Sequence, residues 1–235
     1  MIKGDIRKQQ ILNTAETLFA ERGYEGTSVQ DILDVLHLSK GSFYHHFESK
    51  ESVLSQICEN RAKMALDKIN RSLPDNGLER MNLLLSEMIP FQGEGLSFLK
   101  MILPVFILPE GKSVRNGYQE ALKACWLSPT EKALALMNEQ GQAFTLFPDA
   151  TASIVLDLTN DLWAMISQEI IQSEKYKRDQ VSPGRLLNLV DPYRSALENI
   201  MSAPYGSIEL INLEQLTHLT EEIHDWWMIK PSDQI

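Results

Sequence analysis

The amino-acid sequence predicts an all-α fold: an N-terminal helix-turn-helix domain of three helices, followed by a larger helical domain. Apolar residues recur at helical spacing along almost the whole chain, and we find no alternating strand pattern with hairpin signals. Segments rich in proline and glycine are expected to separate the helical stretches, as at "PDNG" (74–77), "PFQGEG" (90–95), "PEGKS" (109–113), "LSP" (127–129) and "APYGS" (203–207). A chain of 235 residues, 43% of them hydrophobic, is long enough to bury a large core.

The first fifty residues predict three helices and the start of a fourth. The first helix is expected from Asp5, as its N-cap, to about Gly23, with one apolar stripe. Thr27 is expected to cap the second helix, in a capping box with Gln30. A break at His37 and Leu38 follows. Serines are then expected to cap a third short helix and a fourth helix over 50–73, namely Ser39 and Ser49.

The segment "LHLSKGSFYHHFESK" (36–50) carries the polar chemistry of this region. A helix, a turn of three to four residues and a second helix form the helix-turn-helix pattern, whose second helix enters the DNA major groove. Phe43 and Phe47 are expected to face inward, while the polar residues around them can donate to phosphates or base edges. The candidate DNA-binding residues are Thr27, Ser28, Ser39, Lys40, Gly41, Ser42, Tyr44, His45, His46 and Lys50.

The stretch "TSVQDILDVLHLSKGSFYHHFESKESVL" resembles the DNA-binding signature of the TetR (tetracycline repressor) family of bacterial regulators. The upstream segment "ILNTAETLFAERGYEGTS" resembles the first helix of that family and its exit, so the likeness covers roughly residues 7–60. Helix two departs from the family pattern with larger residues, and His37 stands where the family usually has glycine. Because a turn position with positive φ favours glycine, we expect a slightly strained or differently shaped turn there.

The resemblance implies a DNA-binding domain over 1–50, with helix four as the connection, and an effector-binding and dimerisation domain over 51–235. It further implies a homodimer formed by helices at about 150–172 and 184–202. The first of these helices is nearly apolar all round, which independently indicates burial on two sides. Residues 208–235 are expected to add a C-terminal helix beyond the usual core.

The expected partners are double-stranded operator DNA and a small apolar or aromatic effector. An apolar pocket between helices is the usual small-molecule site of a bundle. The candidate pocket residues are Phe98, Met101, Tyr118, Trp126 and Trp163. The alternative is a DNA-binding regulator whose second domain senses a protein partner. Asp157 and Asp161 could serve a cationic ligand, although a place at the surface or the dimer seam is favoured.

Composition and motifs disfavour an enzyme, and no cofactor is expected. Residues 51–217 contain no histidine, and neither a Walker loop nor a G-x-G-x-x-G motif occurs. Adjacent His45 and His46 lack a partner at metal-ligand spacing, and His218, Glu221 and Asp225 fit a solvated face better than a metal half-site.

Charge and hydropathy give the expected location. The net charge is −10, of which residues 1–50 carry only −1, so the acidic excess lies in the second domain. The N-terminus has no apolar signal run, and Cys58 and Cys125 are expected to be reduced thiols. The apolar stretch Phe98–Leu108 is too short to cross a bilayer. A cytoplasmic protein without membrane contact is therefore expected.

Overall fold

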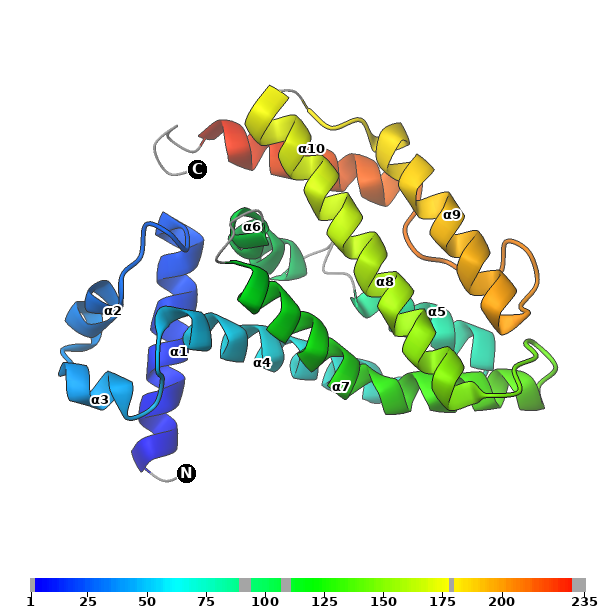
Figure 1. Cartoon of the computed structure of the whole chain (residues 1–235), viewed down its shortest axis with the longest axis horizontal. Coiled ribbons are helices and arrows are strands. Elements are labelled where there is room, and N and C mark those ends of the chain that lie inside the picture. The colour runs from blue at the N-terminus through cyan, green and yellow to red at the C-terminus, as the bar shows by residue number, and fades with distance from the viewer. Residues whose placement is uncertain (1–2, 89–93, 107–110, 178–179, 230–235) are drawn as a thin grey trace.

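The computed structural model describes residues 3–88, 94–106, 111–177 and 180–229, and within these ranges it is all-α (Figure 1). The described residues form ten α-helices and one π-helical turn, with no β-strand. The predicted fold class is confirmed. No helix in the described part of the chain is both long and apolar enough to span a bilayer.

Three helices form a small unit at one end of the molecule, on the left in Figure 1, and a fourth runs from it into the larger domain. These helices are α1 (Lys3–Arg22), α2 (Val29–Leu36), α3 (Lys40–Tyr44) and α4 (Lys50–Asn70). Gly23 ends α1 with a φ of 79°, a left-handed conformation that favours glycine. The helix is already formed at Lys3, so Asp5 lies in its first turn and is not the N-cap.

The start of α2 differs from the sequence-based expectation by one residue. Ser28, not Thr27, is the N-cap, and its capping box is closed by Asp31 rather than Gln30. Thr27 has no exposed surface, and its hydroxyl donates to the carbonyl oxygens of Leu18 and Gly23, at 3.2 and 2.9 Å. Thr27 therefore holds the loop against α1 from the interior of the protein. Its hydroxyl serves this contact and does not cap α2.

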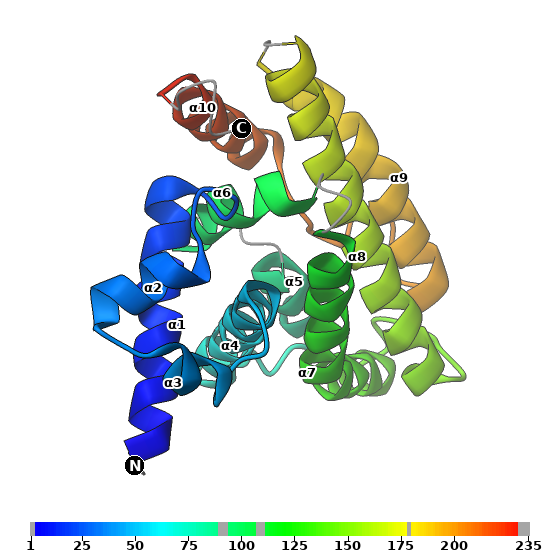
Figure 2. The same ribbon diagram turned by 60° about the vertical axis from the view of Figure 1, so that its left-hand side comes forward.

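The second domain wraps its helices around a core that is continuous with the first. Its elements are α5 (Gly77–Met88), α6 (Glu94–Phe106), α7 (Gly111–Glu139), α8 (Pro148–Ile171), the π-helix η1 (Gln172–Lys177), α9 (Pro183–Met201) and α10 (Leu213–Ile229). Helix α7 packs between α4 and α8, and α8 and α9 lie side by side along the outer edge (Figures 1 and 2). The two helices predicted near 150–172 and 184–202 are thus present.

The break predicted at "LSP" (127–129) is wrong, because α7 continues through Pro129. Proline cannot donate the N–H that would normally bond the carbonyl of Cys125. One residue further on, the Thr130 hydroxyl donates to the Trp126 carbonyl at 2.8 Å, and the Trp126 side chain is completely buried. Tertiary packing therefore holds the helix together across a residue that usually ends one. Of the other predicted breaks, 90–95 and 109–113 lie partly outside the described residues.

The predicted C-terminal helix is confirmed as α10, which packs on α6 and α9. Two side-chain contacts fasten its polar side. Lys100 on α6 bonds Glu222 at 2.9 Å, and His224 Nδ1 lies 2.9 Å from the buried carboxylate of Glu174 in η1. Its apolar side is buried against the domain core through Leu216, Leu219, Ile223 and Trp227.

Candidate DNA-binding surface and effector site

Helix α3 turns one face to the core and the other to solvent. Phe43 has no exposed surface and Phe47 is also buried, as expected for the two residues that hold the helix against α1 and α2. Ser39 caps the helix by accepting from the Ser42 N–H at 3.3 Å. The outward residues are Ser39, Lys40, Gly41, Tyr44 and His45, with Ser42 and His46 partly buried at the edge.

Tyr44 is the most prominent side chain of this face, with 55% of its surface exposed. Its ring meets the edge of the buried Phe43 ring, with 5.4 Å between centroids, so one side is held while the hydroxyl faces water. His45 and His46 contact each other edge to face at 4.9 Å. Among the described residues, no three His, Cys, Asp or Glu side chains are gathered as a metal site would need.

The turn between α2 and α3 passes through a left-handed residue at His37, with φ 52° and ψ 45°. This is the conformation expected where glycine is usual. The His37 N–H donates back to the carbonyl of Asp34 at 3.3 Å, and the Leu38 N–H donates to Leu33 at 2.9 Å. The end of α2 is therefore closed by backbone hydrogen bonds although a histidine occupies the turn.

Lys50, at the start of α4, is engaged within the protein. Its Nζ donates to the Tyr24 carbonyl at 2.8 Å and lies 4.0 Å from the centroid of the Tyr24 ring. Burial, with Glu51 nearby, raises the pKa of the Tyr24 hydroxyl. Lys50 thus ties α4 to the loop after α1, and a contact with phosphate would compete with these bonds.

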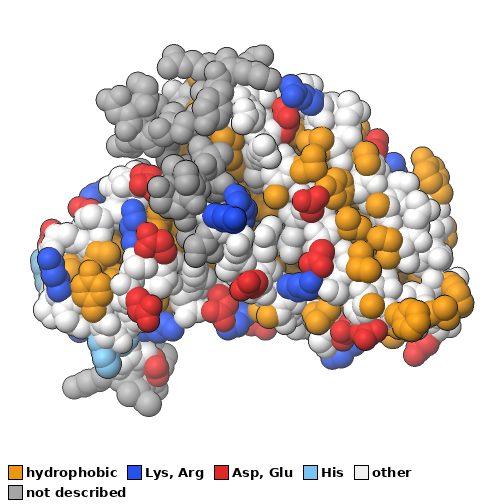
Figure 3. Space-filling model, in the orientation of Figure 1, with side chains coloured by type: hydrophobic (Ala, Val, Ile, Leu, Met, Phe, Trp, Pro, Cys, Tyr) orange, Lys and Arg blue, Asp and Glu red, His pale blue; other side chains and the backbone are white. Residues whose placement is uncertain are grey.

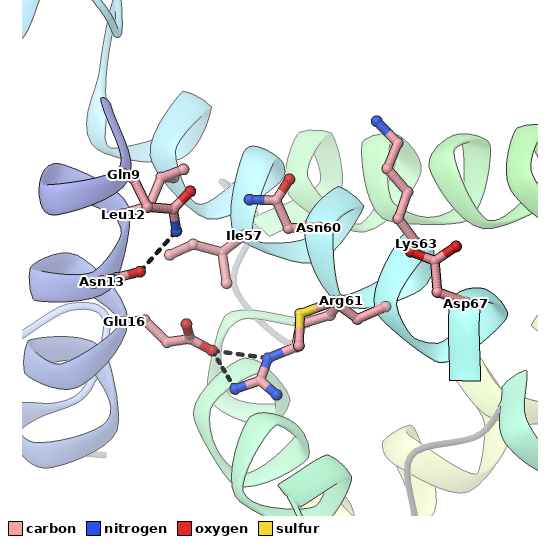
Figure 4. A pocket seen from close by; sticks show the side chains of 10 residues that line it. Gln9, Leu12, Asn13, Glu16, Ile57, Asn60, Arg61, Lys63 and Asp67 are labelled. Carbon is pink, nitrogen blue, oxygen red and sulfur yellow. Dashed lines mark hydrogen bonds and ion pairs between the residues drawn. The ribbon is translucent and has the colours of Figure 1, made fainter. Parts of the chain in front are cut away.

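The junction between α1 and α4 contains an open groove with a volume of about 520 Å³ (Figure 4). Across it, Arg61 on α4 donates to one carboxylate oxygen of Glu16 on α1, from Nε at 2.9 Å and from Nη2 at 2.6 Å. This pair joins residues 45 positions apart, so local sequence patterns could not have revealed it. The groove is lined by Gln9, Leu12, Asn13, Glu16, Ile57, Asn60, Arg61, Lys63, Met64 and Asp67.

The five candidate pocket residues are all buried in the second domain, on α6, α7 and α8, and none lines the α1–α4 groove. Phe98 and Tyr118 contact each other edge to face, with 5.9 Å between ring centroids. Within the described part of the chain, the indole N–H of Trp126 and the buried hydroxyl of Ser167 have no hydrogen-bond partner. Leaving such donors unpaired in the interior is costly.

The outer face of α8, beside α9, keeps large apolar side chains in contact with water. Ile154 and Met165 on α8 are 46% and 39% exposed, and Figure 3 shows apolar side chains gathered over this side of the molecule. The Tyr193 hydroxyl of α9 donates to Asp161 and lies near the Met165 sulfur. Asp157 bonds Lys123 at 2.8 Å. Both carboxylates thus have partners on this exposed surface.

Comparison with known proteins agrees with the helix-turn-helix arrangement. Residues 11–57 match the family model of bacterial regulatory proteins, tetR family. The chain is 31% identical over 116 residues to the uncharacterized HTH-type transcriptional regulator YerO of Bacillus subtilis (strain 168), covering 48% of this chain and 40% of YerO. It is 51% identical over 51 residues to the HTH-type transcriptional repressor KstR2 of Rhodococcus jostii (strain RHA1), covering 22% of this chain and 25% of KstR2.

The chain therefore spans less than half the length of these two relatives. The whole fold is similar to a solved TetR-family regulator from Syntrophomonas wolfei (strain Goettingen), with a TM-score of 0.55 and 16% identity over 87% of this chain and 99% of that one.

A capped helix, a left-handed turn and a short helix with a polar outer face together form a helix-turn-helix unit, the arrangement by which DNA-binding regulators present a helix to the major groove. The match at residues 11–57 identifies this part of the chain as the DNA-binding domain of bacterial regulatory proteins of the tetR family.

Proposed function

We propose that this chain is a homodimeric transcriptional repressor that leaves its operator when a small apolar effector binds the second domain. The observation that carries this proposal is α3, which is pinned by Phe43 and Phe47 while its polar face stays exposed. A recognition helix must be rigid and accessible at once. The name of KstR2, a repressor, supports the direction of regulation. Residues 1–50 would read DNA, and 51–235 would bind effector and partner.

For the contact with DNA, we retain the outward residues of α3 together with Ser28, Ser42 and His46. Thr27 is withdrawn because its hydroxyl is buried and already bonded. Lys50 keeps a place near the DNA through the position of α4, and its bond to Tyr24 fixes the spacing between α4 and the loop after α1. Lys40 and Tyr44 are the two side chains we expect to contribute most.

For the dimer, we propose the outer face of α8 and α9. Large apolar residues exposed on α8, beside half-buried apolar residues of the adjacent α9 and a tyrosine that is already hydrogen-bonded, suit a four-helix seam with a second copy. Sedimentation of the Ile154→Glu variant tests this: the variant should sediment as a monomer where the wild type is a dimer. A variant that remains dimeric would place the interface elsewhere.

For the effector, a small molecule is favoured over a protein partner by the buried Trp126 N–H. An indole donor inside the core, lacking a protein acceptor in the described residues, suits an apolar ligand that brings one acceptor atom of its own. A protein partner would reach only the domain surface. Binding of effector would lower operator affinity by the same factor by which DNA lowers effector affinity.

The direct test is to select DNA duplexes from a random pool with the purified protein. The Kd for the selected duplexes is then measured at several salt concentrations. We expect an imperfect palindrome with half-sites centred about 34–36 Å apart, or a multiple of this. The affinity should fall steeply with salt, because phosphate contacts release counterions. Failure to enrich any sequence, or binding indifferent to salt, would overturn the proposed function.

A further inference from the structure

A chain of four side chains links the DNA-binding end to the interior of the second domain. Glu16 on α1 accepts two hydrogen bonds from Arg61 on α4 (Figure 4). The Arg61 guanidinium carbon lies 6.0 Å from the centroid of the Phe98 ring on α6. Phe98 in turn meets the edge of Tyr118 on α7. One arginine thus contacts both the first helix and one of the candidate effector residues.

The surroundings of Arg61 make this link stronger than an ordinary surface pair. The side chains of Arg61 and Glu16 are 29% and 30% exposed, so water screens their attraction only in part. Guanidinium is planar and weakly hydrated, which lets it lie near an aromatic ring while it donates to a carboxylate. Lysine carries a compact, strongly hydrated ammonium group, which would be less suited to contact the ring and the carboxylate at the same time.

The two ends of this series of side chains lie in the two domains that the proposed function requires. Glu16 follows directly on Ala15, which is fully buried in the core that supports α2 and α3. Phe98 and Tyr118 are both buried, so a molecule entering between α6 and α7 would have to displace one ring or the other. Helix α6 also packs directly against α1, which brings the two domains together at this point.

We propose that Arg61 is a positioning residue that couples the packing of Phe98 and Tyr118 to the placement of α1, and so to operator affinity. This inference rests on the proposed function and names the route by which occupancy of the second domain is felt by the recognition helix. When Phe98 moves, Arg61 loses its contact with that ring, and its hydrogen bonds to Glu16 are weakened or redirected.

Other bonds between α1 and α4 do not share this property. Lys8 on α1 donates to Gln56 on α4 at 2.7 Å, and among the described residues Gln56 donates onward to Glu59 and Asn60 of its own helix. Those bonds hold the two helices together without reaching α6. Arg61 differs because it bonds Glu16 of α1 and also lies near the ring of Phe98 on α6.

The experiment is a mutant cycle on operator affinity that needs no effector. Its probe is a duplex selected from a random pool by the wild-type protein. Operator Kd is measured for Glu16→Gln, Phe98→Leu and their combination, first with Arg61 and then with Arg61→Met. Glu87→Gln is the matched control, because Glu87 on α5 pairs with Lys68 of the same helix α4, at 2.9 Å, away from the DNA-binding end. Circular dichroism checks that each variant is folded, and Phe98→Met replaces Phe98→Leu if the latter is not.

If Arg61 couples the two sites, Glu16→Gln and Phe98→Leu each raise operator Kd about threefold, and together they raise it about threefold rather than ninefold. In the Arg61→Met background, Phe98→Leu should have no measurable effect, while Glu87→Gln should leave Kd unchanged throughout. An effect of Phe98→Leu that persists with Met at position 61, or fully multiplicative effects, would overturn the inference. If the wild-type protein selects no duplex, the proposed function fails and the inference falls with it.

Discussion

Replacing His37 by glycine tests whether the turn between α2 and α3 is strained. His37 is exposed and has φ 52°, a conformation that costs a residue with a side chain roughly 1–2 kcal/mol. Glycine removes this cost but loses about 0.5–1 kcal/mol more than other residues through its greater freedom when unfolded. His37→Gly should therefore leave the free energy of unfolding unchanged or raise it by up to about 1.5 kcal/mol.

A matched control isolates the contribution of the turn conformation. His45, exposed at the end of α3, has the ordinary right-handed φ of −69°. His45→Gly gains nothing from the wider φ range of glycine, because position 45 is already right-handed. The free energy of unfolding should therefore fall by about 0.5–1 kcal/mol. Because the loss on unfolding is common to both variants, their difference of about 1–2 kcal/mol reports the left-handed cost together with the lost ring contact between His45 and His46.

Urea unfolding followed by circular dichroism, with every protein at one concentration, measures both variants. Ser202, with φ 50° at the end of α9, offers a second left-handed position. Ser202→Gly should behave like His37→Gly. The reasoning would be refuted if His37→Gly destabilised the protein as much as His45→Gly does.

Three further predictions follow from the DNA-binding end and from the core. Tyr44→Ala should weaken operator binding by about 1–3 kcal/mol in a gel-shift titration while the dimer sediments unchanged, and loss of dimer would refute the assignment of that surface. Ser28→Ala should lower the free energy of unfolding by about 1 kcal/mol, whereas Gln30→Ala should have little effect because Asp31 closes the capping box. Burial raises the pKa of the Cys58 thiol from about 9 to about 12, so a thiol reagent should label Cys125 before Cys58 in the folded protein. The unfolded thiol ionises first, so stability should also fall as pH rises from about 9 towards 12, and a Cys58→Ala variant should show a shallower slope because buried tyrosines such as Tyr24 still contribute.

Local patterns predicted the DNA-binding end well because its signals are local. The spacing of apolar residues placed Ile11, Ala15 and Phe19 in the core, and caps and breaks bounded the helices to within a few residues. The errors arose where two adjacent residues have similar chemistry. Thr27 and Ser28 can both cap a helix, and only the packing of the loop decides which hydroxyl is buried.

The second domain was less predictable because its determinants are contacts distant in sequence. Pro129 predicts the end of a helix, yet α7 continues past it because its neighbours are packed in the core. Burial of the five candidate pocket residues followed from their apolar character, but which of them touch did not. The Glu16–Arg61 pair and the groove beside it join two helices whose relative placement no periodicity encodes.

Helix α10 has a consequence for anyone who shortens this protein. Although it follows the helices typical of the family, it is not an appendage, because its inner side completes the core of the second domain. A chain ending near residue 212 would uncover apolar surface on α6 and α9 and strand the buried carboxylate of Glu174 without His224. Such a fragment would be prone to aggregate, whereas the first domain would keep every contact it makes within itself.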